Sequence, residues 1–167
     1  MLRIYRSVIT PTPRRRDAER DVTGRLIKEA FGQDATLNHD PDGRPQLTGV
    51  PLDASDPLHI SLSHSRTEAV LAVCDMMPVG IDIESWRPAL RTTLAKWLTP
   101  AERAYINTDA ELLRAWTAKE AMFKALPAPQ PVSLLEVSLT DTRFTVNHIT
   151  EGTGDEMTDI AVALLHG

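Results

Sequence analysis

The segment Val-Gly-Ile-Asp-Ile-Glu at residues 79–84 decides most of what the sequence predicts. Side chains alternate between the faces of a β-strand, so Ile81 and Ile83 share one face while Asp82 and Glu84 share the other. The isoleucines can anchor in a core, and the carboxylates, with Cα atoms about 6.6 Å apart, face a common space. Like charges this close repel unless a cation lies between them. Such hard oxygen ligands favour Mg²⁺, held by one or two carboxylates and substrate phosphates.

Residues 109–126 predict a long helix, which Asp109 can cap and Pro127 stops. At about 100° per residue, its bulky apolar residues and three charged ones fall within an arc of about 140°. These residues are Leu112, Leu113, Trp116, Lys119, Glu120, Phe123 and Lys124. Glu120 can add a third carboxylate to a metal site, with Lys119 and Lys124 flanking it as polyphosphate binding requires. The alternative is a solvated polar face on the strand and charged groups extending from the edges of a packed stripe on the helix.

The rest of the chain mixes strands and helices in an irregular order. Apolar and alternating runs bounded by turn residues predict strands at 2–9, 58–62, 69–74 and 160–165. A helix is expected at 17–31, ended by Gly32, with a loop-rich stretch after it. A polar turn, Ser63-His64-Ser65-Arg66, separates two of the strands. Because no regular βαβ rhythm repeats, the pattern favours an α+β fold over a doubly wound sheet.

The composition of the chain is typical of a globular domain. The chain has 167 residues, of which 42% are hydrophobic and 25% charged, which suits one compact domain or two small halves sharing a core. No apolar run approaches the ~18 residues that span a bilayer, and the N-terminus has no signal-peptide pattern. The single cysteine, Cys74, cannot form an internal disulfide, so a reducing, cytoplasmic location is expected.

Charge is unevenly placed along the chain. The net charge is −5, yet residues 1–30 hold eight basic and four acidic side chains. An acidic chain without aromatic residues beside its basic run is a poor nucleic-acid binder. The basic patch is suited to a phosphorylated small molecule, or it is only a solvated face.

Common catalytic motifs are missing. The sequence has no GxSxG, no SxxK at Ser63 or Ser65, no HExxH or CxxC, and no Walker-A loop or GxGxxG. His64 therefore has no partner set for a hydrolase triad, and the other four histidines are interpreted as incidental.

Five segments occur in one order between residues 17 and 124. They are Asp17-Ala18-Glu19-Arg20, Gly43-Arg44-Pro45, Ile60-Ser61-Leu62-Ser63-His64-Ser65, Gly80-Ile81-Asp82-Ile83-Glu84 and Trp116-Thr117-Ala118-Lys119-Glu120-Ala121-Met122-Phe123-Lys124. Together they resemble the 4′-phosphopantetheinyl transferases, particularly the larger, surfactin-synthetase-activating type. The last two segments are specific, whereas the second and third are weak alone but correctly ordered.

The resemblance implies a reaction and its partners. The phosphopantetheine arm of coenzyme A would pass to a serine hydroxyl of an apo acyl or peptidyl carrier protein, releasing 3′,5′-ADP. No nucleic acid or membrane partner is expected. Such a reaction moves a phosphoryl group, so charge neutralisation and in-line positioning matter more than covalent chemistry.

The resemblance also implies site residues. Mg²⁺ would be held against the pyrophosphate by Asp82, Glu84 and Glu120. Phosphate contacts would come from Ser63, His64, Lys119 and Lys124, with Arg44 beside the adenine and Arg20 on the 3′-phosphate. The serine proton would go to Glu120, directly or through a water, and Lys124 would stabilise charge on the leaving oxygen.

Finally, the resemblance implies a monomer built as a pseudodimer of two similar halves. The short, trimeric members begin almost directly at their Gly-x-Asp segment, whereas here 79 residues precede Gly80. We expect residues 1–78 to contact coenzyme A and residues 79–167 to hold the metal site and catalytic helix. Two alternatives remain: another Mg²⁺-dependent phosphoryl-group enzyme such as a phosphodiesterase, or a non-catalytic module that binds carrier proteins or coenzyme A.

Overall fold

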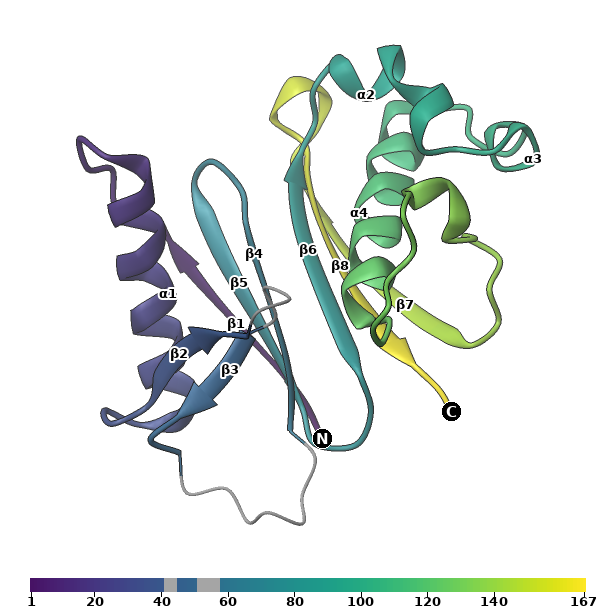
Figure 1. Ribbon diagram of the computed structural model, residues 1–167. Helices are drawn as coiled ribbons and strands as arrows, with labels where there is room; N and C mark the ends of the chain where they lie inside the picture. Colours follow the sequence, from purple (N-terminus) through teal and green to yellow (C-terminus); the bar gives the residue numbers. More distant parts are fainter. Residues whose placement is uncertain (41–44, 51–57) are drawn as a thin grey trace.

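The computed structural model describes residues 1–40, 45–50 and 58–167, and its first part is a sheet covered by one helix (Figure 1). The sheet has the antiparallel order β1-β5-β4, so the last strand lies in the middle. A separate two-stranded ribbon, β2-β3, follows the helix α1. The bounds are β1 Leu2–Val8, α1 Arg15–Phe31, β2 Thr36–His39, β3 Pro45–Thr48, β4 His59–His64 and β5 Glu68–Cys74.

The second part contains another three-stranded sheet, with longer connections between its elements. Its antiparallel order is β6-β8-β7, again with the last strand in the middle. The main elements are β6 Val79–Ser85, α4 Asp109–Ala125, β7 Phe144–Glu151 and β8 Thr158–Leu165. The short helices are α2 Ala89–Thr92 and α3 Pro100–Arg103, with 3₁₀ turns η1 Leu94–Lys96, η2 Leu134–Glu136 and η3 Gly154–Glu156. In both parts a strand and a 17-residue helix precede an antiparallel strand pair.

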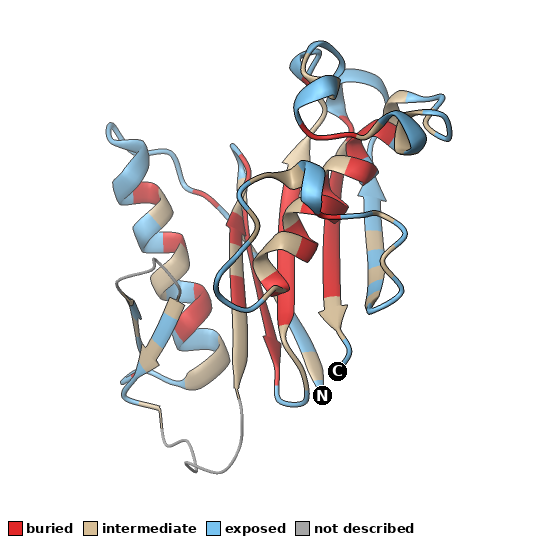
Figure 2. Ribbon diagram, turned by 45° about the vertical axis from the view of Figure 1, so that its right-hand side comes forward, coloured by how far each residue is buried: buried red, intermediate tan, exposed pale blue. Residues whose placement is uncertain are grey.

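The elements stack in four layers, α1, first sheet, second sheet and α4 (Figures 1 and 2). Strand β5 lies between two of these layers, and its side chains point alternately toward one and the other. Ala69, Leu71 and Val73 join the core beneath α1, while the intervening Val70, Ala72 and Cys74 pack with residues of β6 and β8. A further core lies between α4 and the outer face of the second sheet. Burial on both faces explains the continuous apolar run of β5.

Helix α4 is fixed at its start and along its length. Thr108 and Glu111 form a capping box, in which each side chain accepts a hydrogen bond from the other residue's backbone N–H. Farther along, the helix comes so close to β6 that a Cβ at Gly80 would overlap the backbone carbonyl oxygen of Ala121. Glycine at position 80 therefore allows the close helix–strand approach that sets the distance between α4 and the carboxylates of β6.

The structure confirms most of the expected elements and corrects two. The mixed α/β architecture agrees with the α+β expectation, and the strand at 79–84 and the helix at 109–126 are present. The stretch after Gly32, expected to be loop-rich, contains the β2-β3 ribbon. His64, expected in a turn, ends strand β4. None of the described helices is long and apolar enough to cross a membrane.

Candidate active site

Asp82 lies at the centre of the site, on the face of β6 toward α4. It is buried, and its Oδ1 accepts hydrogen bonds from Ser63 Oγ and Lys124 Nζ, each at 2.7 Å. Lys124 Nζ also donates to the Ile81 carbonyl at 3.1 Å. In contrast, Asp82 Oδ2 is buried and has no hydrogen-bond partner among the described residues. Oδ1 of this carboxylate thus accepts two side-chain hydrogen bonds, whereas Oδ2 accepts none from the described residues.

Glu84 and Glu120 flank Asp82 from β6 and α4. Burial raises the pKa of each, and the negative charge of Asp82 raises both further. Arg87 and Lys124 act in the opposite direction on both carboxyl groups, and Arg87 lies 3.4 Å from Glu84 as an ion pair. Three carboxyl groups from two elements therefore lie within electrostatic range of each other and of Lys124.

The carboxyl groups fit a cation that is shared with a ligand rather than one enclosed by protein. Within the described ranges, no three His, Cys, Asp or Glu side chains form a group that could hold a metal ion by themselves. Mg²⁺ commonly needs only one or two protein carboxylates, with phosphates and waters completing its octahedron. Asp82 Oδ2, which has no hydrogen-bond partner in the described part of the chain, could supply such a ligand atom, and Glu84 or Glu120 could supply another.

His64, at the end of β4, lies between helix α1 and Lys124. Its Nε2 and Thr23 Oγ1 of α1 are 2.8 Å apart. Burial lowers the pKa of His64; Glu19 raises it, whereas Lys124 and Arg15 lower it further. A charge on the imidazole would thus be disfavoured unless an anion bound beside it.

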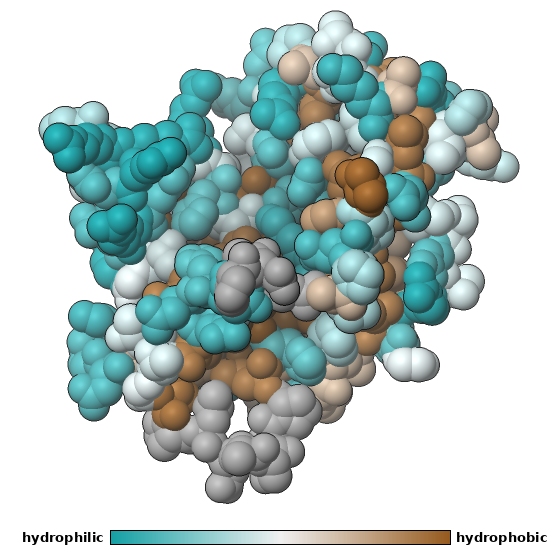
Figure 3. Space-filling model, in the orientation of Figure 1, coloured by the Kyte–Doolittle hydropathy of each residue, from teal (hydrophilic) through white to brown (hydrophobic). Residues whose placement is uncertain are grey.

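Two cavities extend from this region and share His39 in their walls. One, of about 550 Å³, lies along α1 and is lined by Arg20, Thr23 and His64 among others. The other, of about 520 Å³, lies between β4, β6 and α4 and includes Lys124. Figure 3 shows hydrophilic side chains over the upper part of α1 and apolar surface lower down between the halves. This combination suits a long ligand with a charged end and an apolar portion.

Comparison with known families decides the class of protein. Residues 78–165 match the family model of the 4′-phosphopantetheinyl transferase superfamily. The chain belongs to this superfamily. The match contains Asp82, Glu84, Glu120 and Lys124, and it supports phosphopantetheinyl transfer in general. The comparison with curated proteins found no match.

Three of the residues expected to contact coenzyme A belong to the first part of the chain: Ser63, Arg44 and Arg20. Ser63, expected to contact a phosphate, is buried and donates its hydroxyl hydrogen to Asp82, so here it holds the carboxylate in place. Arg44 lies outside the described residues. Arg20 is exposed on α1 and lines the cavity that also contains His64, and its expected contact with the 3′-phosphate stays a prediction.

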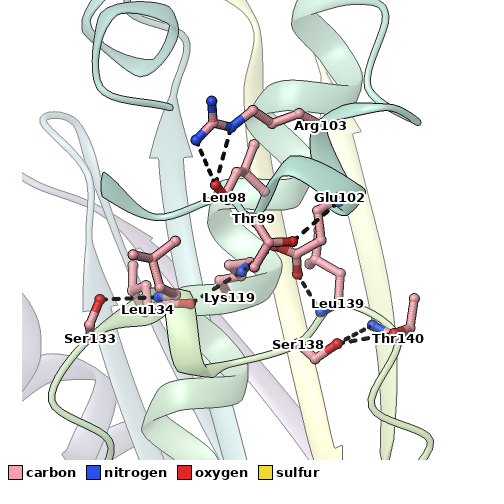
Figure 4. Close-up of polar contacts among 11 residues, drawn as sticks. Leu98, Thr99, Glu102, Arg103, Lys119, Ser133, Leu134, Ser138, Leu139 and Thr140 are labelled. Carbon is pink, nitrogen blue, oxygen red and sulfur yellow. Dashed lines mark hydrogen bonds and ion pairs between the residues drawn. The ribbon is translucent and has the colours of Figure 1, made fainter. Parts of the chain in front are cut away.

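The structure does not bring Lys119 to the carboxylates. Its side chain is completely buried, and its Nζ donates to Glu102 Oε2 at 2.8 Å and to the Leu134 carbonyl at 3.1 Å (Figure 4). The expected phosphate contact of Lys119 is therefore corrected. Successive helix residues are separated by about 100°, and this angle turns Lys119 away from Glu120 toward α3 and the chain after α4.

Sequence reasoning missed a buried polar network next to the site. Asp159 on β8 is fully buried and accepts hydrogen bonds from Thr117 on α4, from His148 Nδ1 at 2.8 Å and from Thr150 at 2.7 Å. Burial raises the pKa of Asp159, but these hydrogen bonds outweigh it and the net pKa is lowered. His148, interpreted as incidental, thus helps to satisfy a buried carboxylate. Asp159 directly precedes the apolar run at 160–165, and a charged residue next to a buried strand is the signal that could have revealed this network.

Proposed function

We propose that the protein is a Mg²⁺-dependent 4′-phosphopantetheinyl transferase that loads apo acyl or peptidyl carrier proteins from coenzyme A. The single observation that carries this proposal is the carboxylate group of Asp82, Glu84 and Glu120 beside Lys124, in which one buried oxygen of Asp82 has no hydrogen-bond partner within residues 1–40, 45–50 and 58–167. Repulsion between the three carboxyl groups is only partly offset by Lys124 and Arg87, so a cation shared with an anionic substrate would stabilise the group further.

The reaction breaks one phosphorus–oxygen bond and forms another. The carrier serine oxygen attacks the phosphorus attached to the pantetheine arm, and the bond to 3′,5′-ADP breaks. Mg²⁺ would supply neutralisation of charge on the pyrophosphate. The proton leaves the serine hydroxyl for Glu120, directly or through a water, and burial suits Glu120 to this task by raising its pKa. Lys124 then meets the charge that grows on the leaving oxygen.

The first half would supply recognition of coenzyme A. His64 lies next to Thr23 and within electrostatic range of Lys124, so an anionic phosphate can approach it from the cavity. Exposed Arg20 on the same cavity wall suits the 3′-phosphate, because an arginine fork pairs well with phosphate oxygens.

We further propose the larger, pseudodimeric type of transferase, active as a cytoplasmic monomer. Residues 1–78 and 79–167 would be its two halves, with coenzyme A bound between them. The equal strand order in the two sheets and the 17-residue helix in each half support this assignment. The cavities next to β4, β6 and α4 lie where a ligand between the halves would bind.

Incubation with coenzyme A, Mg²⁺ and a panel of apo carrier proteins, followed by intact-mass measurement, tests the proposal. A carrier should gain the mass of the phosphopantetheine arm while 3′,5′-ADP forms in equal amount. Asp82→Asn is the matched control, because it preserves the size of the side chain and removes its charge. Cleavage of coenzyme A without a mass gain would instead indicate a phosphodiesterase, and binding without either product would indicate a non-catalytic module.

A further inference from the structure

The buried ion pair between Lys119 and Glu102 joins parts of the chain that are distant in sequence (Figure 4). Lys119 belongs to α4 and is 0% exposed, while Glu102 belongs to α3 and its side chain is 8% exposed. A lysine enclosed to this extent cannot touch a ligand unless the surrounding chain moves. Its ammonium is also occupied, because it donates to Glu102 and to the Leu134 carbonyl.

Glu102 also accepts hydrogen bonds from the start of its own helix, α3, and from the chain after α4. Its Oε2 accepts from Thr99 N at 2.9 Å and from Thr99 Oγ1 at 3.0 Å, which closes the capping box of α3. Its Oε1 accepts from the Leu139 backbone N–H at 2.9 Å. One carboxylate thus holds the start of α3, helix α4 and the chain around residues 134–139 together. Lys119 precedes Ala121, which approaches β6, by two residues, or about 200° around the helix, so its bond to Glu102 lies on the side of α4 away from the sheet.

We propose that Lys119 is a positioning residue for phosphopantetheinyl transfer. Its ion pair with Glu102 fixes the rotation of helix α4 about its axis and its distance from β6, and thereby the position of Glu120 relative to Asp82. This inference rests on the proposed function. Helix α4 is held at its sheet side by the close approach at Gly80 and by Lys124 on Asp82. The Lys119–Glu102 pair holds the opposite side, one residue from Glu120, so loosening it lets the helix turn or shift.

Hydrogen exchange tests the ion pair without any substrate. In Lys119→Met, which keeps an unbranched side chain one atom shorter and removes its charge, the Leu139 amide should exchange at least about tenfold faster, because Glu102, its acceptor, loses the ion pair that holds it in place. Lys96→Met, at an exposed lysine of η1, is the matched control and should leave that exchange rate unchanged. Unchanged protection of Leu139 in Lys119→Met would overturn the proposal, whether or not the protein is a transferase.

Kinetics then separate positioning from ligand contact. Lys119→Met should lower kcat at least about tenfold and leave the KM for coenzyme A within about twofold, at a temperature where both proteins are folded. Lys119→Met/Glu102→Gln leaves no unpaired buried charge, so its kcat should be at least about threefold higher than that of Lys119→Met.

A tenfold rise in the KM for coenzyme A in Lys119→Met, with no recovery in the double variant, would overturn the proposal in favour of direct phosphate contact. If the single variant does not fold, an unchanged KM of the double variant supports positioning, and a tenfold rise overturns it.

Discussion

Helices α1 and α4 each cover the outer face of one three-stranded sheet, yet they are buried to very different extents. Four of the 17 residues of α1 are buried, against nine of the 17 in α4. Helix α1 covers one sheet with Ala18, Val22, Leu26 and Ile27 and leaves its arginine-rich side exposed. Helix α4 is enclosed between its sheet and the chain around residues 134–139. One half therefore presents an open basic surface, and the other fixes the carboxylates.

The polar groups follow the same division. Among the described residues, the fully buried polar side chains Thr117, Lys119 and Asp159 all belong to the second half. Burying such groups is costly unless they are completely hydrogen-bonded, so they specify one arrangement of the helix and sheet. A site that holds several repelling carboxyl groups needs this rigidity, whereas an arginine contacting a phosphate from an exposed helix does not.

The largest expected effect concerns Lys124 on the enclosed helix. Lys124→Ala should lower kcat by at least ~100-fold, the scale of removing one preorganised charge contact, because no other described cation pairs with Asp82. Lys124→Arg should recover only part of the loss, because a planar fork does not replace a compact ammonium. Steady-state rates with coenzyme A and a carrier measure both, and a folded, fully active Lys124→Ala would remove Lys124 from the mechanism.

Gly80→Ala should cost about 1–3 kcal/mol of the free energy of unfolding. The added Cβ would overlap the backbone carbonyl of Ala121, so α4 and β6 must move apart. Thermal and denaturant unfolding give the loss, and kcat should fall with it because Glu120 moves away from Asp82. A variant as stable as the wild type would show that the close approach is unnecessary.

Arg20→Ala, on the exposed side of α1, should weaken the binding of coenzyme A. We expect the KM for coenzyme A to rise about tenfold with little change in kcat, since a charge-assisted contact remote from the reacting atoms supplies ground-state binding. With 3′-dephospho-coenzyme A, which lacks the partner phosphate, the same substitution should matter much less. Equal losses with both substrates would contradict the 3′-phosphate role.

The smallest effect has the opposite sign. Gly24→Ala, in the middle of α1, should raise the free energy of unfolding by about 0.5–1 kcal/mol, because alanine loses less backbone freedom in a helix. Apart from its chain neighbours and the backbone of its own helix, no atom of the described residues lies within 4 Å of the added Cβ, in contrast to Gly80. Urea unfolding of the two alanine variants side by side measures the difference between the halves. A loss of stability in Gly24→Ala would mean that α1 is packed more closely than the structure shows.

The sequence predicted the elements whose signals are local. The alternation at 79–84, the end of α1 at Gly32 and the end of α4 before Pro127 depend on neighbours along the chain, and all three agree with the structure. The β2-β3 ribbon was not predicted, because its strands have only four residues each.

The candidate site was predictable in its residue types but less so in their contacts. Alternation on a strand places Asp82 and Glu84 on one face, and helical spacing places Lys124 one turn after Glu120. The direction of Lys119 depended on Glu102 and Leu134, which reach it only through tertiary packing. Spacing on a helix cannot show whether a charged residue faces a ligand or a buried partner, and the same limit hid the bond from Ser63 to Asp82.

The most direct measurement of the central claim is the transfer rate of Asp82→Asn at saturating Mg²⁺, coenzyme A and apo carrier protein. The asparagine keeps an oxygen that can accept from Ser63 and Lys124, so the melting temperature should stay close to that of the wild type. We expect kcat to fall by at least ~100-fold, because the negative charge of the Asp82 carboxylate is gone. A folded Asp82→Asn protein that loads the carrier at nearly the wild-type rate would contradict this expectation.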